Sequence, residues 1–128
     1  MQIHLRNEID LGGQMEVIDQ RFPVEVTEKN GHYYFVFTND ENEKVMIKSN
    51  SEELTMTRFS TPKSVLRFHR DNPVMVSIPT PLGYQHLLTE TSTYHADFDH
   101  QLIKMNYELK QPETESVFAE YQMEISWQ

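Results

Sequence analysis

The C-terminal part of the chain alternates hydrophobic and polar residues with a period of two. The alternation runs from Ile103 to Leu109, breaks at a polar stretch around Pro112, and resumes from Ala119 to Trp127. Successive side chains of a β-strand point to opposite faces, so this pattern predicts two strands, each with one apolar face. We therefore predict an antiparallel hairpin that needs a curved, mostly antiparallel sheet to cover its apolar side.

Similar short segments, separated by turn signals, fill the rest of the chain. They predict strands over residues 3–9, 14–26, 32–38, 44–48, 53–59, 64–70, 74–78, 84–90 and 93–99. The last two can also form one strand that bends near Ser92. In the second segment the apolar phase changes between Val17 and Phe22, next to Pro23, which predicts a β-bulge or bend.

No segment shows the periodicity of an amphipathic helix. Many short strands at this spacing are typical of a β-sandwich or a β-barrel. Short hairpin loops, strands with bends and the need to remove exposed edges favour the barrel. The predicted fold is all-β: a single up-and-down, antiparallel barrel of about eight strands.

Length and composition narrow the class of protein. The 128 residues predict one domain, residues 1–128, and the lack of cysteine excludes disulfides, thiolate metal sites and cysteine nucleophiles. We expect no signal peptide, because no basic and apolar segment precedes the first predicted strand, and no apolar run approaches the roughly 18 residues of a membrane span. The net charge of −9 disfavours nucleic acids and anionic membranes as partners. We expect a cytoplasmic protein.

The order of the segments resembles that of the YwiB-like family, uncharacterised bacterial proteins with a calycin (lipocalin-like) barrel. The similar segments are Ile3–Leu5 with the Gly12-Gly13 turn, Gln14–Ile18, Asn30–Tyr34, Leu54–Arg58, Thr80–Gly83, Leu88–Thr91 and Met105–Leu109. Where the family has glycine after the arginine, this chain has Phe59 and Ser60. The resemblance implies a barrel of about eight strands that can enclose a cavity, and it implies no catalytic residues.

Five residues are candidates for contacting a small apolar or amphipathic ligand. Arg58 shares its phase with Leu54 and Met56, so it can lie at the inner mouth of the barrel and meet a carboxylate. The simpler interpretation is an arginine at a strand end that reaches water along its alkyl stem. The aromatic candidates for the cavity wall are Tyr33, Phe35, Tyr107 and Tyr121. For these, core packing is the simpler interpretation.

Metal binding and catalysis receive less support. His95, Asp97 and Asp99 share one strand face, with His86 and His100 nearby, but an ordinary solvent face leading into a turn is the interpretation that we favour. No nucleophile elbow, phosphate-binding loop or zinc motif occurs. We expect no metal, no cofactor and no enzymatic activity. The predicted function is binding of a small ligand inside the barrel. The alternative is a protein-interaction or homo-oligomeric module with a fully packed core.

Overall fold

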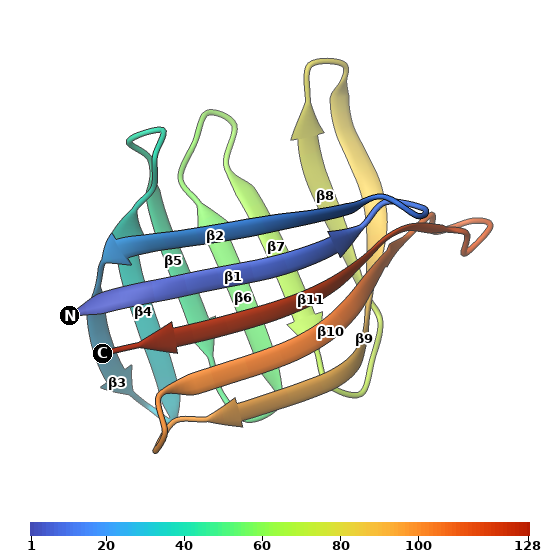
Figure 1. Ribbon diagram of the computed structural model, residues 1–128. Helices are drawn as coiled ribbons and strands as arrows, with labels where there is room; N and C mark the ends of the chain where they lie inside the picture. Colours follow the sequence, from blue (N-terminus) through green and yellow to red (C-terminus); the bar gives the residue numbers. More distant parts are fainter.

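The computed structural model describes residues 1–128 and contains only β-strands and their connections (Figure 1). The eleven strands are β1 (Gln2–Asp10), β2 (Met15–Pro23), β3 (Glu25–Lys29), β4 (His32–Thr38), β5 (Lys44–Ser49), β6 (Glu53–Arg58), β7 (Ser64–His69), β8 (Val74–Thr80), β9 (Gly83–Asp97), β10 (Leu102–Lys110) and β11 (Val117–Trp127). No helix is present that could cross a membrane.

The strands form two antiparallel sheets that curl around one interior. One sheet has the order β2-β1-β11-β10-β9-β8 and the other has the order β3-β4-β5-β6-β7. Consecutive strands pair within each sheet, and β1 pairs with β11, so the two ends of the chain meet. Backbone bonds of 2.7 and 3.0 Å join Gln2 and Gln128. The predicted all-β, up-and-down, calycin-like barrel is confirmed, with eleven strands instead of about eight.

The closing hairpin is also confirmed. Strand β11 pairs with β10 and turns Ala119, Met123, Ile125 and Trp127 into the interior, where all four side chains are buried. The predicted segments 84–90 and 93–99 form the single strand β9, and its register with β10 shifts at Ser92. This irregularity lets one long strand follow the curvature of the sheet.

The prediction for the second strand was wrong. Strand β2 pairs with β1 without a register shift, so no bulge lies between Val17 and Phe22. Val17 is a hydrophobic residue on the solvent face, and this produced the apparent change of phase. The bend lies instead at Val24, where the chain leaves the first sheet and enters the second as β3.

The barrel is not sealed around its full circumference. Strand β2 lies at the end of its sheet, and no strand pairs with its outer edge. In Figure 1, β1, β2 and β11 run across the front of β4 to β7, so the two sheets cross steeply. In such packing, strands that switch sheets hold the corners together. Here the chain passes from β2 to the second sheet at the Val24 corner.

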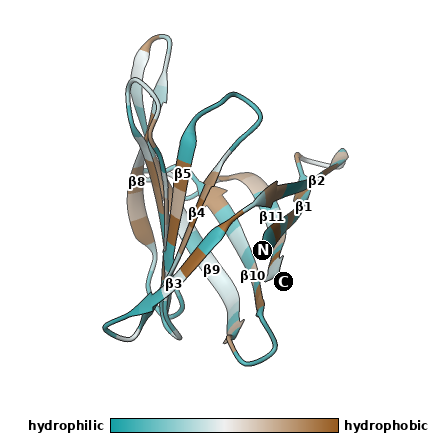
Figure 2. Ribbon diagram, turned by 90° about the vertical axis from the view of Figure 1, so that its left-hand side faces the viewer, coloured by the Kyte–Doolittle hydropathy of each residue, from teal (hydrophilic) through white to brown (hydrophobic).

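The core combines side chains from both sheets. Fully buried residues include Ile3, Phe35, Ile47, Leu54 and Ile125. Figure 2 shows hydrophobic segments along β4, β5 and β8 and several hydrophilic loops between strands. Nineteen buried hydrophobic residues form one cluster, so the alternation that predicts the strands also produces a continuous core.

Two buried hydroxyl groups join distant strands. The hydroxyl of Tyr94, on β9, lies 2.7 Å from Ser49 Oγ and donates to the carbonyl oxygens of Asn50 (2.9 Å) or Glu53 (3.0 Å). Thr89 donates to the carbonyl oxygen of Arg67 at 2.6 Å. Both link the first sheet to the second, so hydrogen bonds from side chains hold the sheets together where no backbone ladder does.

Candidate functional site

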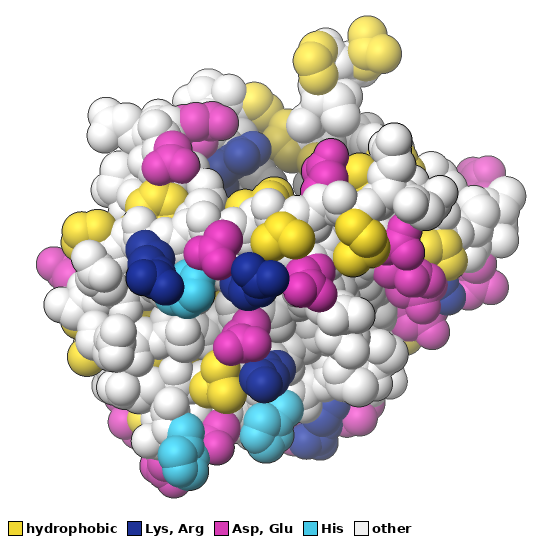
Figure 3. Space-filling view, viewed as in Figure 1, with side chains coloured by type: hydrophobic (Ala, Val, Ile, Leu, Met, Phe, Trp, Pro, Cys, Tyr) yellow, Lys and Arg dark blue, Asp and Glu magenta, His cyan; other side chains and the backbone are white.

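An apolar cavity of about 350 Å³ lies inside the barrel and opens to solvent beside β2. Strands of both sheets contribute its wall, which consists of Leu5, Arg6, Asn7 and Ile9 (β1), Ile18 and Gln20 (β2), Met56 (β6), Leu66 (β7), Ile78 (β8), Tyr107 and Leu109 (β10), and Tyr121 and Met123 (β11). In Figure 3 the surface is hollowed above β2, next to the projecting hairpin of β8 and β9. A volume of this size lies at the small end of the range for ligand pockets, roughly 300–1,000 Å³.

The register of the first sheet explains why this part of the interior is hollow and partly polar. Asn7 lies directly opposite Ile18 on β2 and Met123 on β11, so all three side chains point inward. Gln20 is on the same face, and its amide donates to Asp40 Oδ2 (2.9 Å) in the loop between β4 and β5. The row through Asn7 continues over Met123 and Met105 to Tyr94 on β9. Beside this row, space remains between the two sheets.

Tyr107 and Tyr121 form one wall of the cavity. Their rings are stacked with centroids 4.6 Å apart, and the ring of Phe68 lies 4.4 Å from that of Tyr107. Burial raises the pKa of Tyr107 above its ordinary value, and the neighbouring amide of Asn7 opposes part of this rise. Burial also raises the pKa of Tyr121, with a smaller contribution from Glu16. Both phenols therefore stay neutral and can donate hydrogen bonds.

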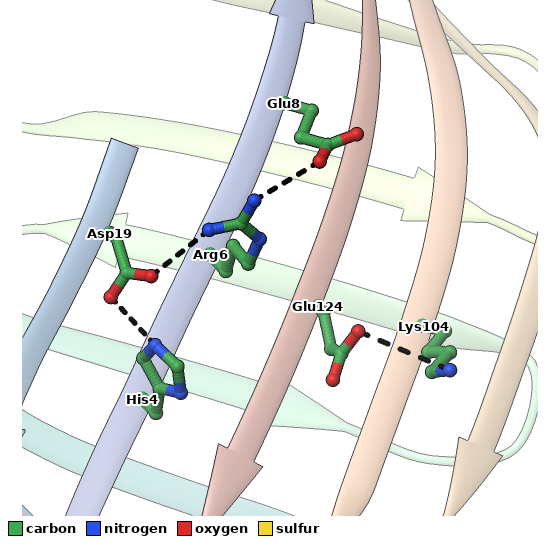
Figure 4. A network of polar contacts seen from close by, with 6 residues as sticks. All are labelled: His4, Arg6, Glu8, Asp19, Lys104 and Glu124. Atoms are coloured by element: carbon green, nitrogen blue, oxygen red, sulfur yellow. Dashed lines mark hydrogen bonds and ion pairs between the residues drawn. The ribbon is translucent and has the colours of Figure 1, made fainter. Parts of the chain in front are cut away.

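The basic residue that borders the cavity directs its charge away from it. The guanidinium of Arg6 contacts Asp19 and Glu8 on the outer face of the sheet, each at 3.2 Å (Figure 4). His4 joins the same network at 2.7 Å from Asp19. Hydrogen bonds from His4 and then Arg6 lower the pKa of Asp19. The network neutralises Arg6 outside the barrel, so no free cation faces the cavity from β1.

The structure brings together two of the five candidate residues for ligand contact. Tyr107 and Tyr121 line the cavity. Arg58 does not, because its side chain is 47% exposed and its Nε lies 3.7 Å from Glu43 Oε1. Strand β6 ends at Arg58, so this residue reaches solvent although its phase matches that of Leu54. This placement agrees with the simpler interpretation of the arginine.

Tyr33 and Phe35 lie in a packed cluster at the other end of the barrel interior. Tyr33 stacks on Phe98 with centroids 4.2 Å apart, and Phe35 meets Trp127 edge-on at 4.6 Å. Phe35 is completely buried. Neither side chain reaches the cavity. Their role in the structure is core packing, which was the simpler interpretation of the sequence.

Sequence reasoning missed several residues of the cavity wall. Leu5, Ile9 and Leu66 carried a signal, because each has the phase of its strand's apolar face. Asn7 also has this phase, but as a polar residue it indicated only a weak point in the strand. Nothing in the sequence indicated that Ile78, on β8, lines the cavity, because its position there depends on how the two sheets cross.

The histidines and aspartates considered as metal ligands do not converge. His100 Nδ1 lies 2.8 Å from Asp97 Oδ2, and hydrogen bonds from His100 lower the pKa of Asp97. His86 instead contacts Ser77 at 2.8 Å. The structure contains no group of three or more His, Asp or Glu side chains arranged to hold a metal ion. A depression of about 300 Å³ on the outer face is lined by Glu8, Asp10 and other polar residues and resembles an ordinary acidic surface.

The fold and the cavity define the class of protein: a small, all-β, calycin-like barrel with an apolar interior that opens to solvent. Residues 3–125 match the family described as a domain of unknown function, DUF1934. Because the match spans nearly the whole chain, the protein belongs to the DUF1934 family.

A solved structure supports the same assignment. The crystal structure of the YwiB protein from Bacillus subtilis is similar with a TM-score of 0.78 and 19% sequence identity. The alignment covers 99% of this chain and 90% of that chain. The YwiB-like resemblance and the calycin-like fold are thereby confirmed. A comparison with curated proteins gives no match.

Proposed function

We propose that the protein binds a small apolar or amphipathic molecule inside the barrel. The observation that carries this proposal is the cavity, because ten of its thirteen lining residues are hydrophobic and it opens to solvent. Barrels of this size are either filled by side chains or hold one small ligand. An accessible apolar cavity with few polar groups is the usual form of a ligand site. The proposal includes the cytoplasmic location expected from the sequence.

Two adjacent residues of β2 offer a direct test. Ile18 lines the cavity mouth, whereas Val17 points to the solvent face, and both are partly exposed. The neutral fluorescent dye N-phenyl-1-naphthylamine serves as the probe. We expect saturable binding to the wild-type protein, and Ile18→Trp to weaken it by about tenfold or more because the indole blocks the mouth.

Val17→Trp is the matched control, because it adds the same side chain to the other face of the same strand. It should leave the affinity for the dye unchanged. The proposal would be overturned by the absence of saturable binding to the wild-type protein. Equal weakening by both substitutions would also contradict it.

A second candidate function, self-association, is favoured by the β8–β9 hairpin. This hairpin projects from the barrel (Figure 1), and Ile78 on β8 lines the cavity. From Val74 to Thr89 the chain contains no Asp, Glu, Lys or Arg, although such residues make up 24% of the sequence. Leu82 at the tip is fully exposed, and Met75 and Tyr84 are more than half exposed. Depletion of charge together with exposed aromatic and aliphatic residues is typical of interface cores.

We take a second copy of the chain as the partner at this hairpin. With a net charge of −9, two copies repel each other over most of their surface, and the hairpin is where they can meet without bringing carboxylates together. The hairpin has no basic residues for anionic lipid headgroups. Pro79 and Pro81 lack the N–H groups that edge-to-edge strand pairing needs. Contact therefore takes place through side chains.

Sedimentation of the protein over a range of concentrations tests this second candidate. We expect a dimer that Leu82→Asp weakens by about tenfold or more, because the substitution places a carboxylate in the contact. Leu11→Asp, in the exposed turn between β1 and β2, is the matched control and should leave the dimer unchanged. A wild-type protein that stays monomeric at roughly 100 μM would exclude this function.

A further inference from the structure

One polar side chain stands out among the inward-facing residues of the cavity. Asn7 lies on β1 between Leu5 and Ile9, which have the same phase, and its neighbours across the sheet are Ile18 and Met123. Its Oδ1 atom is buried and has no hydrogen-bond partner in the protein. A buried polar atom without a partner destabilises a protein, so such an atom in a native structure calls for an explanation.

The surroundings of Asn7 form a small polar spot in an apolar wall. The amide lies next to the phenol of Tyr107, which is itself neutral and buried. An amide and a phenol together offer both donors and an acceptor. A bound molecule with a hydroxyl or an amide can therefore complete the hydrogen bonds of this pair while its apolar part fills the remaining space.

The charges around the cavity decide what polar group fits. Arg6 is engaged by Asp19 and Glu8 on the outer face, and Arg58 pairs with Glu43 away from the cavity. One charge that acts on the tyrosine wall is the carboxylate of Glu16, which adds to the effect of burial in raising the pKa of Tyr121. A carboxylate bound here would lose its water without gaining a cation and would also face this like charge.

We infer that the cavity takes an uncharged amphiphile whose hydroxyl or amide hydrogen-bonds to Asn7 and Tyr107, and that it discriminates against fatty-acid carboxylates. This inference rests on the proposed function and adds the chemical class of the ligand. It also replaces the role that the sequence gave to Arg58, which would have favoured an anionic headgroup.

Displacement of N-phenyl-1-naphthylamine by four ten-carbon compounds tests the inference at pH 8. The compounds are 1-decanol, decanoate, decylammonium and decane, which differ in the polar group and share the apolar chain. We expect 1-decanol to displace the dye at a concentration about tenfold or more below those of decanoate and decylammonium, while decane gives the reference for the apolar chain alone. Equal displacement by decanol and decanoate, or tighter binding of decanoate or decylammonium, would overturn the inference and leave the proposed function intact.

Substitution of Asn7 ties the preference to this residue. Asn7→Leu replaces the amide with an apolar group of similar size at an apolar position, so we expect the variant to fold and to bind the dye. Its preference for decanol over decane should fall by about tenfold.

The matched control, Asn106→Leu, changes an exposed asparagine of β10 and should leave the preference unaltered. An Asn7→Leu variant that binds the dye and retains the full preference would contradict the inference. The absence of dye binding to the wild-type protein would instead remove the proposed function.

Discussion

The two ends of the barrel interior are built by the same strands, but one end is filled by side chains and the other contains a cavity. At one end, Ile3 on β1 pairs with Trp127 on β11, and Trp127 packs against Phe35, so the space is filled. At the other end, Ile9 pairs with Tyr121 on the same two strands, and a cavity of about 350 Å³ remains. Both ends have the same alternation of inward and outward residues. Alternation therefore specifies the inner face, while side-chain volume and the crossing of the sheets decide whether it is filled.

The difference between the ends also concerns polarity. In the filled end the rings of Tyr33, Phe98 and Trp127 lie within 6.5 Å of one another. Aromatic side chains bury large areas and dominate the energetics of a core. In the hollow end the amide of Asn7 occupies an inward position, with one atom unpaired. We therefore expect stability to depend mainly on the filled end and binding mainly on the hollow end.

The largest expected effect comes from removing the centre of the filled end. Trp127→Ala should lower the free energy of unfolding by about 3–5 kcal/mol, because it deletes a buried indole and leaves a cavity. Ile18→Ala at the mouth of the hollow end should cost less than about 1 kcal/mol, since this side chain is 43% exposed. Urea unfolding followed by circular dichroism measures both. Similar losses in the free energy of unfolding for the two variants would contradict the view that the filled end contributes most of the stability.

The next effect concerns the contact that fastens the two sheets together. Tyr94→Phe removes the hydroxyl that bonds Ser49 and the carbonyl oxygens of the β5–β6 turn. The free energy of unfolding should fall by about 1–3 kcal/mol, because buried acceptors lose their donor. Thermal unfolding at neutral pH measures the change. Tyr84→Phe, at an exposed tyrosine of the hairpin, is the control and should cost almost nothing.

The difference in stability between the wild-type protein and Tyr94→Phe should depend on pH. Burial raises the pKa of Tyr94 to about 12, whereas its ordinary value is 10.0. Between these values the native state binds the proton that the unfolded state releases, so the free energy of unfolding decreases as pH rises. The stability that Tyr94 contributes is complete below about pH 10 and is lost as pH rises through about 12. The advantage of the wild-type protein over Tyr94→Phe should therefore shrink in this window.

Much of the fold follows from the sequence, because strand phase is a local property. The closing hairpin and the up-and-down order depend on neighbouring segments, and the alternation predicts both. The corner at Val24 was misplaced, because the exposed hydrophobic residue Val17 mimicked a change of phase. A hydrophobic residue on a solvent face cannot be distinguished from a core residue by its type alone.

The candidate site was less predictable for a physical reason. Tyr33 and Tyr107 are the same residue type at inward or half-buried strand positions, yet one lies in a filled cluster and the other borders a cavity. Phase gives the face on which a side chain lies, but its position along the barrel depends on contacts between strands distant in sequence. The same limit applies to Arg58, whose phase suggested the mouth and whose strand end places it in solvent.

A smaller effect on stability, with a larger effect on binding, should follow from filling the hollow end. Met56→Phe adds volume to the cavity wall on β6, and we expect the free energy of unfolding to change by no more than about 1 kcal/mol. Affinity for N-phenyl-1-naphthylamine should fall, because the ring occupies the dye's space. Titration of the dye combined with urea unfolding tests this separation. A large loss of stability with unchanged binding would show that no usable space lies beside Met56.

The smallest effect should come from Arg58, the residue that its strand phase placed at the barrel mouth. Arg58→Ala breaks an exposed contact with Glu43 that spans 3.7 Å, and such surface ion pairs contribute roughly 0–1 kcal/mol. The free energy of unfolding and the affinity for the neutral dye should both remain close to the wild-type values. Displacement of the dye by decanoate should also be unchanged, because the guanidinium does not border the cavity. A loss of decanoate affinity of about tenfold would mean that Arg58 reaches the bound molecule, and it would restore the anionic ligand as the better candidate.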